Sequence, residues 1–150
     1  PVIKNIFLNA VEIKNVVTMP EEVFYIDASM PNMEFQLSGQ NILSADVFVN
    51  EKDSLSLPAM RAMLEEQPEN VRVEYDHLGN IGEFFVRWKE VDNFDSSKPN
   101  DRHYLIDRMD STLHFGDGVS VRIPSVRRSL RKKYFCCSCF FRFPTFLFIF

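Results

Sequence analysis

The sequence predicts a mainly β protein, α+β at most, built of antiparallel strands and hairpins with one short helix around residues 57–66. Two observations predict this class. Apolar and polar residues alternate over several short stretches bounded by turn residues, which is the period of a half-buried strand. A helical period occurs in one stretch. A chain of 150 residues is long enough to bury one hydrophobic core.

Residues 1–55 are predicted to form an N-terminal β segment. Apolar residues recur among polar ones near its start, at Ile3, Phe7, Val11 and Ile13. Further along, Ala45, Val47 and Val49 alternate with Ser44, Asp46 and Asn50, as expected for a strand with one buried face.

Residues 56–124 are predicted to form a helix followed by a β-hairpin module. Ser56 and Pro58 suit the start of a helix, and Gln67-Pro68 should end it, because a residue before proline avoids the helical region. The apolar stripe between them consists of Met60, Met63 and Leu64.

Two strands with a turn at residues 76–80 should follow this helix. Val71, Val73 and Tyr75 alternate with charged residues in the first strand. The second strand, residues 81–91, carries Phe84 and Phe85 on opposite faces and the only tryptophan, Trp88. We expect these three side chains in the core or at an interface. Residues 93–100 are predicted to be an exposed loop.

The segment 101–124 is predicted to contain two short strands joined by a tight hairpin around Phe115-Gly116-Asp117-Gly118. Both glycines tolerate positive φ, and Asp117 is expected to form the turn rather than to bind a ligand. Asp107 could accept two hydrogen bonds from an arginine, Arg102 or Arg108, and so join strand to turn. A solvated charge cluster is the alternative.

Charge divides the chain into two parts. Residues 1–126 contain 11 Lys/Arg against 21 Asp/Glu, a net charge of −10, whereas residues 127–150 contain six basic residues and no acidic one. An acidic body repels phosphate backbones, which argues against nucleic-acid binding. The cysteines, Cys136, Cys137 and Cys139, all lie in the basic part, so no disulfide framework is expected in residues 1–126.

Residues 125–150, basic and rich in Phe and Cys, are predicted to lie outside the fold. One interpretation is that the true reading frame was lost near residue 125. The other is a membrane anchor, with the basic run on anionic lipid and the cysteines as acylation sites. The apolar stretch falls short of the roughly 20 residues of a spanning helix.

Catalytic and metal-binding patterns are weak in this sequence. The three histidines, His77, His103 and His114, lack the spacing of zinc ligands. Asp107, Asp110 and Asp117 could supply oxygen ligands for calcium, but the EF-hand spacing is missing, and surface carboxylates are the simpler interpretation. We therefore expect no enzyme activity, no metal and no cofactor.

Several motifs resemble one protein family, the baseplate J-like proteins of contractile phage tails and related injection machines. The most specific are Val86-Arg87-Trp88-Lys89-Glu90-Val91-Asp92-Asn93-Phe94, Asp101-Arg102-His103-Tyr104 through Asp107-Arg108, and Phe115-Gly116-Asp117-Gly118, followed by Pro124. The stretch Val47-Phe48-Val49-Asn50-Glu51 resembles an earlier strand of the family. The chain departs from the family at Ser111 and Ser120, near which members usually have glycine, and at Ser125, where a second proline is common.

The resemblance covers residues 1–124 and implies a structural, non-catalytic role. Such proteins join neighbouring subunits into a ring around the tail tube. The partners would be other baseplate proteins in a hetero-oligomeric ring, with no nucleic acid or membrane. Localisation would be the bacterial cytoplasm during assembly and then the baseplate of the particle. Because the chain starts at Pro1, we expect it to be a fragment of a longer protein.

Two other functions are kept as hypotheses. The first is a carbohydrate-binding or carbohydrate-active β module, which would need Asp107 and Asp110 to converge on a cleft. The second is a lipid-anchored adaptor that uses the cysteine-rich C-terminal part.

Overall fold

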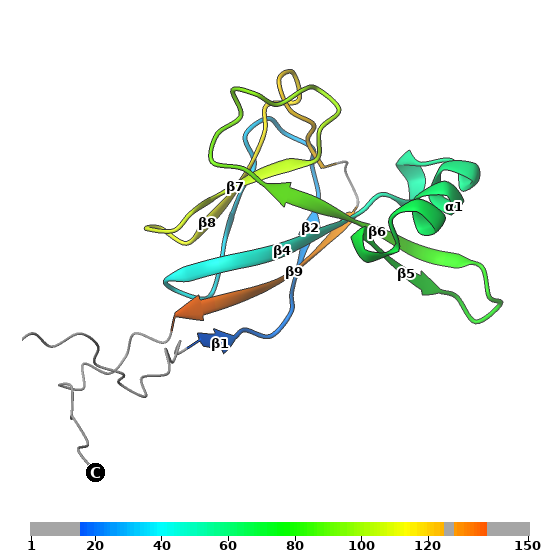
Figure 1. Cartoon of the computed structure of the whole chain (residues 1–150), viewed down its shortest axis with the longest axis horizontal. Helices are drawn as coiled ribbons and strands as arrows, with labels where there is room; N and C mark the ends of the chain where they lie inside the picture. Colours follow the sequence, from blue (N-terminus) through cyan, green and yellow to red (C-terminus); the bar gives the residue numbers. More distant parts are fainter. Residues whose placement is uncertain (1–15, 125–127, 138–150) are drawn as a thin grey trace, which may run out of the picture.

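The structure, a computed structural model, describes residues 16–124 and 128–137 and confirms the predicted mainly β class (Figure 1). In chain order the elements are β1 (Val16–Thr18), β2 (Glu22–Ile26), β3 (Glu34–Gln36), β4 (Ile42–Asn50), the 3₁₀ turn η1 (Lys52–Ser54), α1 (Leu57–Glu66), the 3₁₀ turn η2 (Pro68–Asn70), β5 (Val71–Tyr75), β6 (Ile81–Glu90), β7 (His103–Asp107), β8 (Thr112–Phe115) and β9 (Arg128–Cys137). The strand pattern expected near Ile3–Ile13 lies outside the described residues.

The strands form one mixed sheet in the order β1-β9-β4-β6-β7-β8-β3, with β2 also paired to β9 and β5 to β6. Strand β6 is shared by the two halves of this sheet. It runs antiparallel to β4 through the pairs Val47↔Trp88 and Asn50↔Phe85. Its last residues run parallel to β7, where Lys89 pairs with His103.

The sheet curls around its main core. The rings of Phe24 on β2 and Phe35 on β3 come from the two ends of the strand order, yet their centroids are 5.4 Å apart. Edge-to-face contacts continue from Phe35 to Phe115 and from Phe115 to Trp88, at 5.9 and 5.3 Å. Trp88 is 2% exposed. This geometry adds to the stabilisation that the buried ring area provides.

The hairpin β5–β6 and helix α1 project from this body as an arm (Figure 1). A second, smaller core holds them together, formed by Met60, Val71, Phe84 and Val86. The predicted helix is confirmed at both ends. The Ser56 hydroxyl accepts a hydrogen bond from the backbone N–H of Ala59, and the helix stops at Glu66, before Gln67-Pro68.

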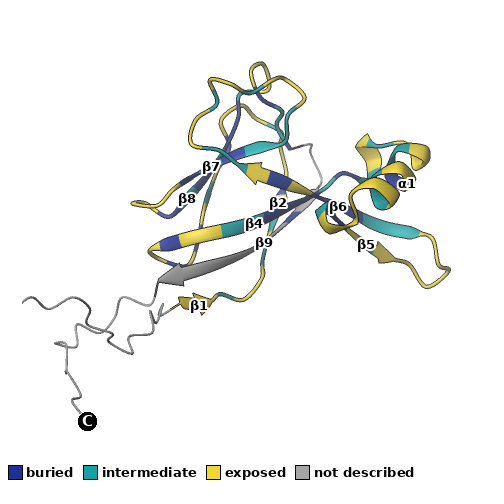
Figure 2. Ribbon diagram, viewed as in Figure 1, coloured by how far each residue is buried: buried dark blue, intermediate teal, exposed yellow. Residues whose placement is uncertain are grey.

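Phe84 and Phe85 are both buried, so β6 is covered on both faces, as their opposite orientation indicates. Phe84 belongs to the core of the arm, whereas Phe85 lies on the other face. Buried residues gather where β4, β6, β7 and β8 meet, while the tip of the arm is exposed (Figure 2).

The prediction that residues 125–150 lie outside the fold is wrong for ten of them. Strand β9 lies between β4 and the pair β1 and β2, with Leu130 opposite Val49 on one side and Phe24 on the other. Leu130 is fully buried in the main core. An interior strand is stabilised by pairing with neighbours on both edges. The basic composition of this segment therefore does not indicate that it forms a strand. Residues 138–150, including Cys139, lie outside the described residues.

The hairpin predicted around Phe115–Gly118 is also wrong, because no strand follows β8 within residues 116–124. The hairpin is formed earlier, by β7 and β8, where Asp107 pairs with Thr112. Residues 116–121 form a compact loop instead. The backbone N–H of Gly118 donates to the carbonyl of Val121 at 2.9 Å, and a Cβ atom at Gly116 would lie 2.6 Å from the Cβ of Val121, so position 116 has no room for a side chain.

Candidate functional site

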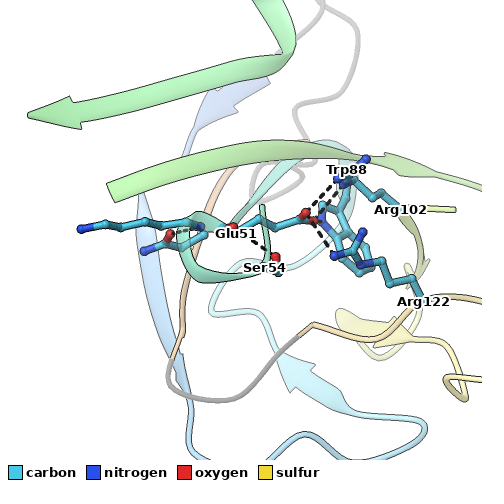
Figure 3. A network of polar contacts seen from close by, with 7 residues as sticks. Glu51, Ser54, Trp88, Arg102 and Arg122 are labelled. Atoms are coloured by element: carbon cyan, nitrogen blue, oxygen red, sulfur yellow. Dashed lines mark hydrogen bonds and ion pairs between the residues drawn. The ribbon is translucent and has the colours of Figure 1, made fainter. Parts of the chain in front are cut away.

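Glu51, the first residue after β4, has a buried carboxylate at the junction of the arm and the body. Its residue is 3% exposed. Its backbone N–H donates to the carbonyl of Phe84 at 2.8 Å, and its carbonyl accepts from the N–H and the hydroxyl of Ser54 at 3.0 and 3.1 Å (Figure 3). These bonds fix the backbone and so direct the side chain inward.

Three side chains converge on this carboxylate (Figure 3). Arg102 donates from Nε to Oε1 at 2.9 Å and from Nη2 to Oε2 at 2.8 Å, a two-pronged, charge-assisted pair. The indole N–H of Trp88 donates to Oε1 at 3.2 Å. Arg122 lies 3.4 Å from Oε2 through its Nη2. Two cations and one indole therefore share a single anion.

The two arginines come from different loops. Arg102 ends the loop of residues 91–102, and Arg122 lies in the loop that follows β8. Both arginine side chains are 26% exposed, whereas that of Glu51 is 4% exposed. One buried carboxylate therefore holds two loops against the junction of β4 and β6. We call Glu51, Trp88, Arg102 and Arg122 the loop clasp.

The expectation that Asp107 pairs with an arginine is wrong. Its Oδ1 accepts the backbone N–H groups of Met109 and Asp110 at 2.8 and 3.2 Å, and these bonds hold its pKa below the usual value. Arg108 instead forms an ion pair with Glu90. Asp107 can bond the backbone because it immediately precedes the turn of residues 108–111, whereas Arg102 already has a buried partner.

Asp117 forms a turn, as predicted. Its Oδ1 accepts the backbone N–H groups of Val119, Ser120 and Val121 at 2.9, 2.7 and 3.3 Å. These bonds stabilise the carboxylate and lower its pKa to about 2. Gly118 has a φ of +79°, in the left-handed region that favours glycine.

The remaining motif residues also make internal contacts. The Tyr104 hydroxyl donates to the carbonyl of Ala45 at 2.7 Å, and burial raises its pKa. His103 Nδ1 lies 2.8 Å from the Ser97 hydroxyl, inside the loop of residues 91–102. The carbonyl of Pro124 accepts from the hydroxyl of Ser29 at 2.9 Å.

The structure thus places the motif residues around the loops of residues 91–102 and 116–124. Phe84 lies in the core of the arm, and Phe85 lies on the other face of β6. The residue that the sequence reasoning missed is Glu51. One indication was available, since an acidic residue lies two positions after the apolar run Val47-Phe48-Val49. Its partners lie 37 and 51 residues further along the chain, beyond the reach of local patterns.

Within residues 16–124 and 128–137, no group of three or more His, Cys, Asp and Glu side chains could hold a metal ion. In the same part of the chain, no helix has the length and apolar character needed to cross a bilayer. Cys136 and Cys137 belong to β9, where Cys136 pairs with Val17 and Cys137 with Val16.

Comparisons of the chain with protein-family models, curated proteins and solved structures found no match. The assignment of a function therefore depends on the quoted motifs and on what their residues do in this fold.

Proposed function

We propose that this chain is part of a structural, non-catalytic component of a contractile phage-type tail baseplate. It would assemble with neighbouring baseplate proteins around the tail tube, first in the bacterial cytoplasm and then in the finished particle. The proposal combines the motif resemblance with the contacts that those motif residues make.

The observation that carries the proposal is the backbone at Ser111. This residue has a φ of +56°, in the left-handed region where glycine is favoured. Members of the baseplate J-like family usually have glycine near this position. A backbone that favours glycine in the turn where the family has one supports the view that β7, β8 and their turn follow the family's fold.

The contacts of the motif side chains support a scaffold role. Arg102 pairs with Glu51, Tyr104 donates to the carbonyl of Ala45, and Asp117 caps its own turn. Groups committed in this way fix the loops of residues 91–102 and 116–124. Loops that are ordered before binding lose less conformational entropy when a partner docks on them.

Free strand edges offer further contact surface. Among the described strands, β3 pairs with β8 alone and β5 pairs with β6 alone. An unpaired edge can accept a strand from a neighbouring subunit. A protein that joins subunits in a ring would use such edges together with the ordered loops.

Isolation of tail particles tests this proposal. A tagged chain, expressed in the bacterium that encodes it, should sediment with tail particles and be located at the baseplate end by gold labelling. Arg102→Ala should reduce this incorporation, because it releases a loop, whereas Arg87→Ala, at an exposed pair with Asp46, should leave it unchanged. Absence of the tagged wild-type chain from the particles would contradict the proposal.

A further inference from the structure

One edge of strand β5 has no neighbouring strand in the part of the chain that the structure describes. There β5 pairs with β6 alone, in the arm that projects from the body (Figure 1). An edge of this kind presents backbone N–H and C=O groups that can pair with a further strand. The backbone groups that face outward and the side chains beside them indicate which strand fits.

The backbone of Val73 points to the free edge. Val73 lies opposite Phe84 in the β5–β6 ladder. The carbonyl of Phe84 accepts the N–H of Glu51 at 2.8 Å, and its N–H donates to Oδ1 of Asn50 at 3.4 Å, so both groups are turned away from β5. In an antiparallel ladder, both residues of such a pair direct their backbone groups outward. The N–H and C=O of Val73 therefore face a strand that docks on the edge.

The side chains of β5 are self-complementary about Val73. Arg72 precedes it and Glu74 follows it, and both are exposed. When a second β5 runs antiparallel with Val73 opposite Val73, each Arg72 lies directly opposite a Glu74. Unlike charges at opposite positions stabilise an antiparallel pair, whereas like charges destabilise it. The same register places Val71 opposite Tyr75, an aliphatic side chain beside an aromatic ring that is 62% exposed.

The present contacts of Arg72 are compatible with this register. Its Nη1 lies 3.1 Å from Oε1 of Glu21, and its guanidinium carbon lies 3.8 Å from the centroid of the Phe48 ring. The side chains of Arg72 and Glu21 are 45% and 38% exposed. A guanidinium has several N–H donors, so Arg72 can bind a second carboxylate without releasing the first.

Other free edges lack this pattern. Strands β1, β2 and β3 also pair on one side only among the described residues, and none of the three contains a lysine or arginine. Antiparallel self-pairing at these edges cannot place unlike charges opposite each other. Strand β5 is therefore the free edge whose own sequence fits a second copy.

We propose that two copies of the chain join through β5 as a symmetric antiparallel pair centred on Val73. The two arm hairpins then form one continuous sheet in the order β6-β5-β5-β6, and the two Val73 residues exchange both N–H···O bonds. The same surface of each copy takes part, so the contact closes as a dimer. The inference names a partner for one of the free edges that support the proposed baseplate role, but the contact is a property of the chain alone.

A contact this small should be weak in solution. Two strands of five residues bury less than the roughly 800 Å² per partner of a standard interface. The dimer should therefore be populated only at high protein concentration, near 1 mM. Hydrogen exchange of the Val73 amide should slow as the concentration rises, because only the dimer gives this N–H a partner strand.

Sedimentation of charge-reversal variants of the full chain tests the inference. Arg72→Glu and Glu74→Arg each place like charges opposite each other twice in the symmetric pair, and each should weaken dimerisation roughly 10-fold or more. The double variant exchanges the two charges and should dimerise like the wild-type chain. An equimolar mixture of the two single variants should form 1:1 heterodimers, because every charge at the contact then faces an opposite charge.

Arg61→Glu is the matched control, since it makes the same change of charge at an exposed residue of α1 in the same arm. It should dimerise like the wild-type chain. Because Arg72→Glu also loses its contact with Glu21, thermal unfolding of each variant checks the fold, and recovery in the mixture separates pairing from misfolding.

Four results would each overturn the inference. They are a wild-type chain that stays monomeric at about 1 mM, single variants that dimerise like the wild-type chain, a mixture that stays monomeric, and dimerisation that appears only after removal of residues 1–15 or 138–150. The last result would assign the edge to an end of the same chain. None of these results bears on whether the chain enters tail particles, so the two proposals fail separately.

Discussion

Arg102 and Glu51 are held together by two parallel hydrogen bonds although 51 residues separate them in the chain. Glu51 directly follows strand β4, and Arg102 directly precedes strand β7, so their pairing joins the two halves of the sheet at β6. The pairing also compensates the charge of Glu51, which is the buried acidic residue in the part of the chain that the structure describes.

Loss of this pair should strongly destabilise the protein. Arg102→Ala leaves a buried carboxylate with Trp88 and Arg122 as its remaining partners, and we expect a decrease of about 3 kcal/mol in the free energy of unfolding. Arg87→Ala breaks an exposed ion pair with Asp46 and should cost less than about 1 kcal/mol. Urea unfolding followed by Trp88 fluorescence measures both values. Equal effects of the two substitutions would contradict the importance of the clasp.

Gly116→Val should destabilise the loop that follows β8. A Cβ atom at this position would lie 2.6 Å from two atoms of the Val121 side chain, so the loop must move, at a cost of about 1–3 kcal/mol. Gly79→Ala is the control, because Gly79 has a positive φ but no atom within 4 Å of the new Cβ. Thermal unfolding should show the larger loss for Gly116→Val, from steric overlap rather than from φ.

Ser111→Gly should stabilise the protein by about 0.5–1 kcal/mol, because it relieves the strain of a φ of +56°. Ser120 is the comparison, since the family also usually has glycine near this position but Ser120 has no positive φ in this structure. Ser120→Gly should give no gain, and it removes a hydrogen bond from the Ser120 hydroxyl to Asp117. Chemical denaturation of the two variants distinguishes the positions, and a gain at Ser120 alone would contradict the argument.

Acid should weaken the loop held by Asp117. The pKa of this carboxyl falls from 3.8 to about 2 in the folded state, because backbone N–H groups stabilise its charged form. A lowered folded-state pKa means that the contribution is complete above pH 3.8 and is lost as the pH falls toward 2. Melting temperatures between these values should decrease less steeply for Asp117→Asn than for the wild-type chain. Identical slopes would show that Asp117 does not contribute.

Strand β9 should be required for folding. Leu130→Ala should cost about 2–5 kcal/mol, because Leu130 is fully buried in the main core. Leu43→Ala, at a residue that is 47% exposed, should cost much less. A chain that ends at Pro124 loses the strand between β4 and β2, and its circular dichroism and proteolysis should report an unfolded or loosened sheet. A fully cooperative truncated protein would argue against β9.

The elements that were predicted correctly depend on local chemistry. Ser56 and Pro58 mark the start of α1, and the apolar alternation around Val47 and Trp88 identifies β4 and β6. Asp117 forms its turn with residues that are two to four positions away, so its role could be read from the sequence.

The elements that were missed depend on distant contacts. The β7–β8 turn includes Ser111 with a positive φ. Because this position is a serine and not a glycine, the sequence does not indicate the turn there. Strand β9 lies in a basic segment and is specified by its neighbours β4 and β2. The partner of Arg102 could not be chosen in advance, because several carboxylates were nearer in the chain than Glu51.

The position of β6 has a mechanical consequence. Its first half forms the arm, its middle pairs with β4, and its end lies beside β7, so one continuous backbone runs from the arm tip into both halves of the sheet. A pull applied along this strand at the tip loads the hydrogen bonds to β4 in shear, all at once, rather than peeling them in turn. The tip and the body would then move together as one rigid unit when the strand is pulled.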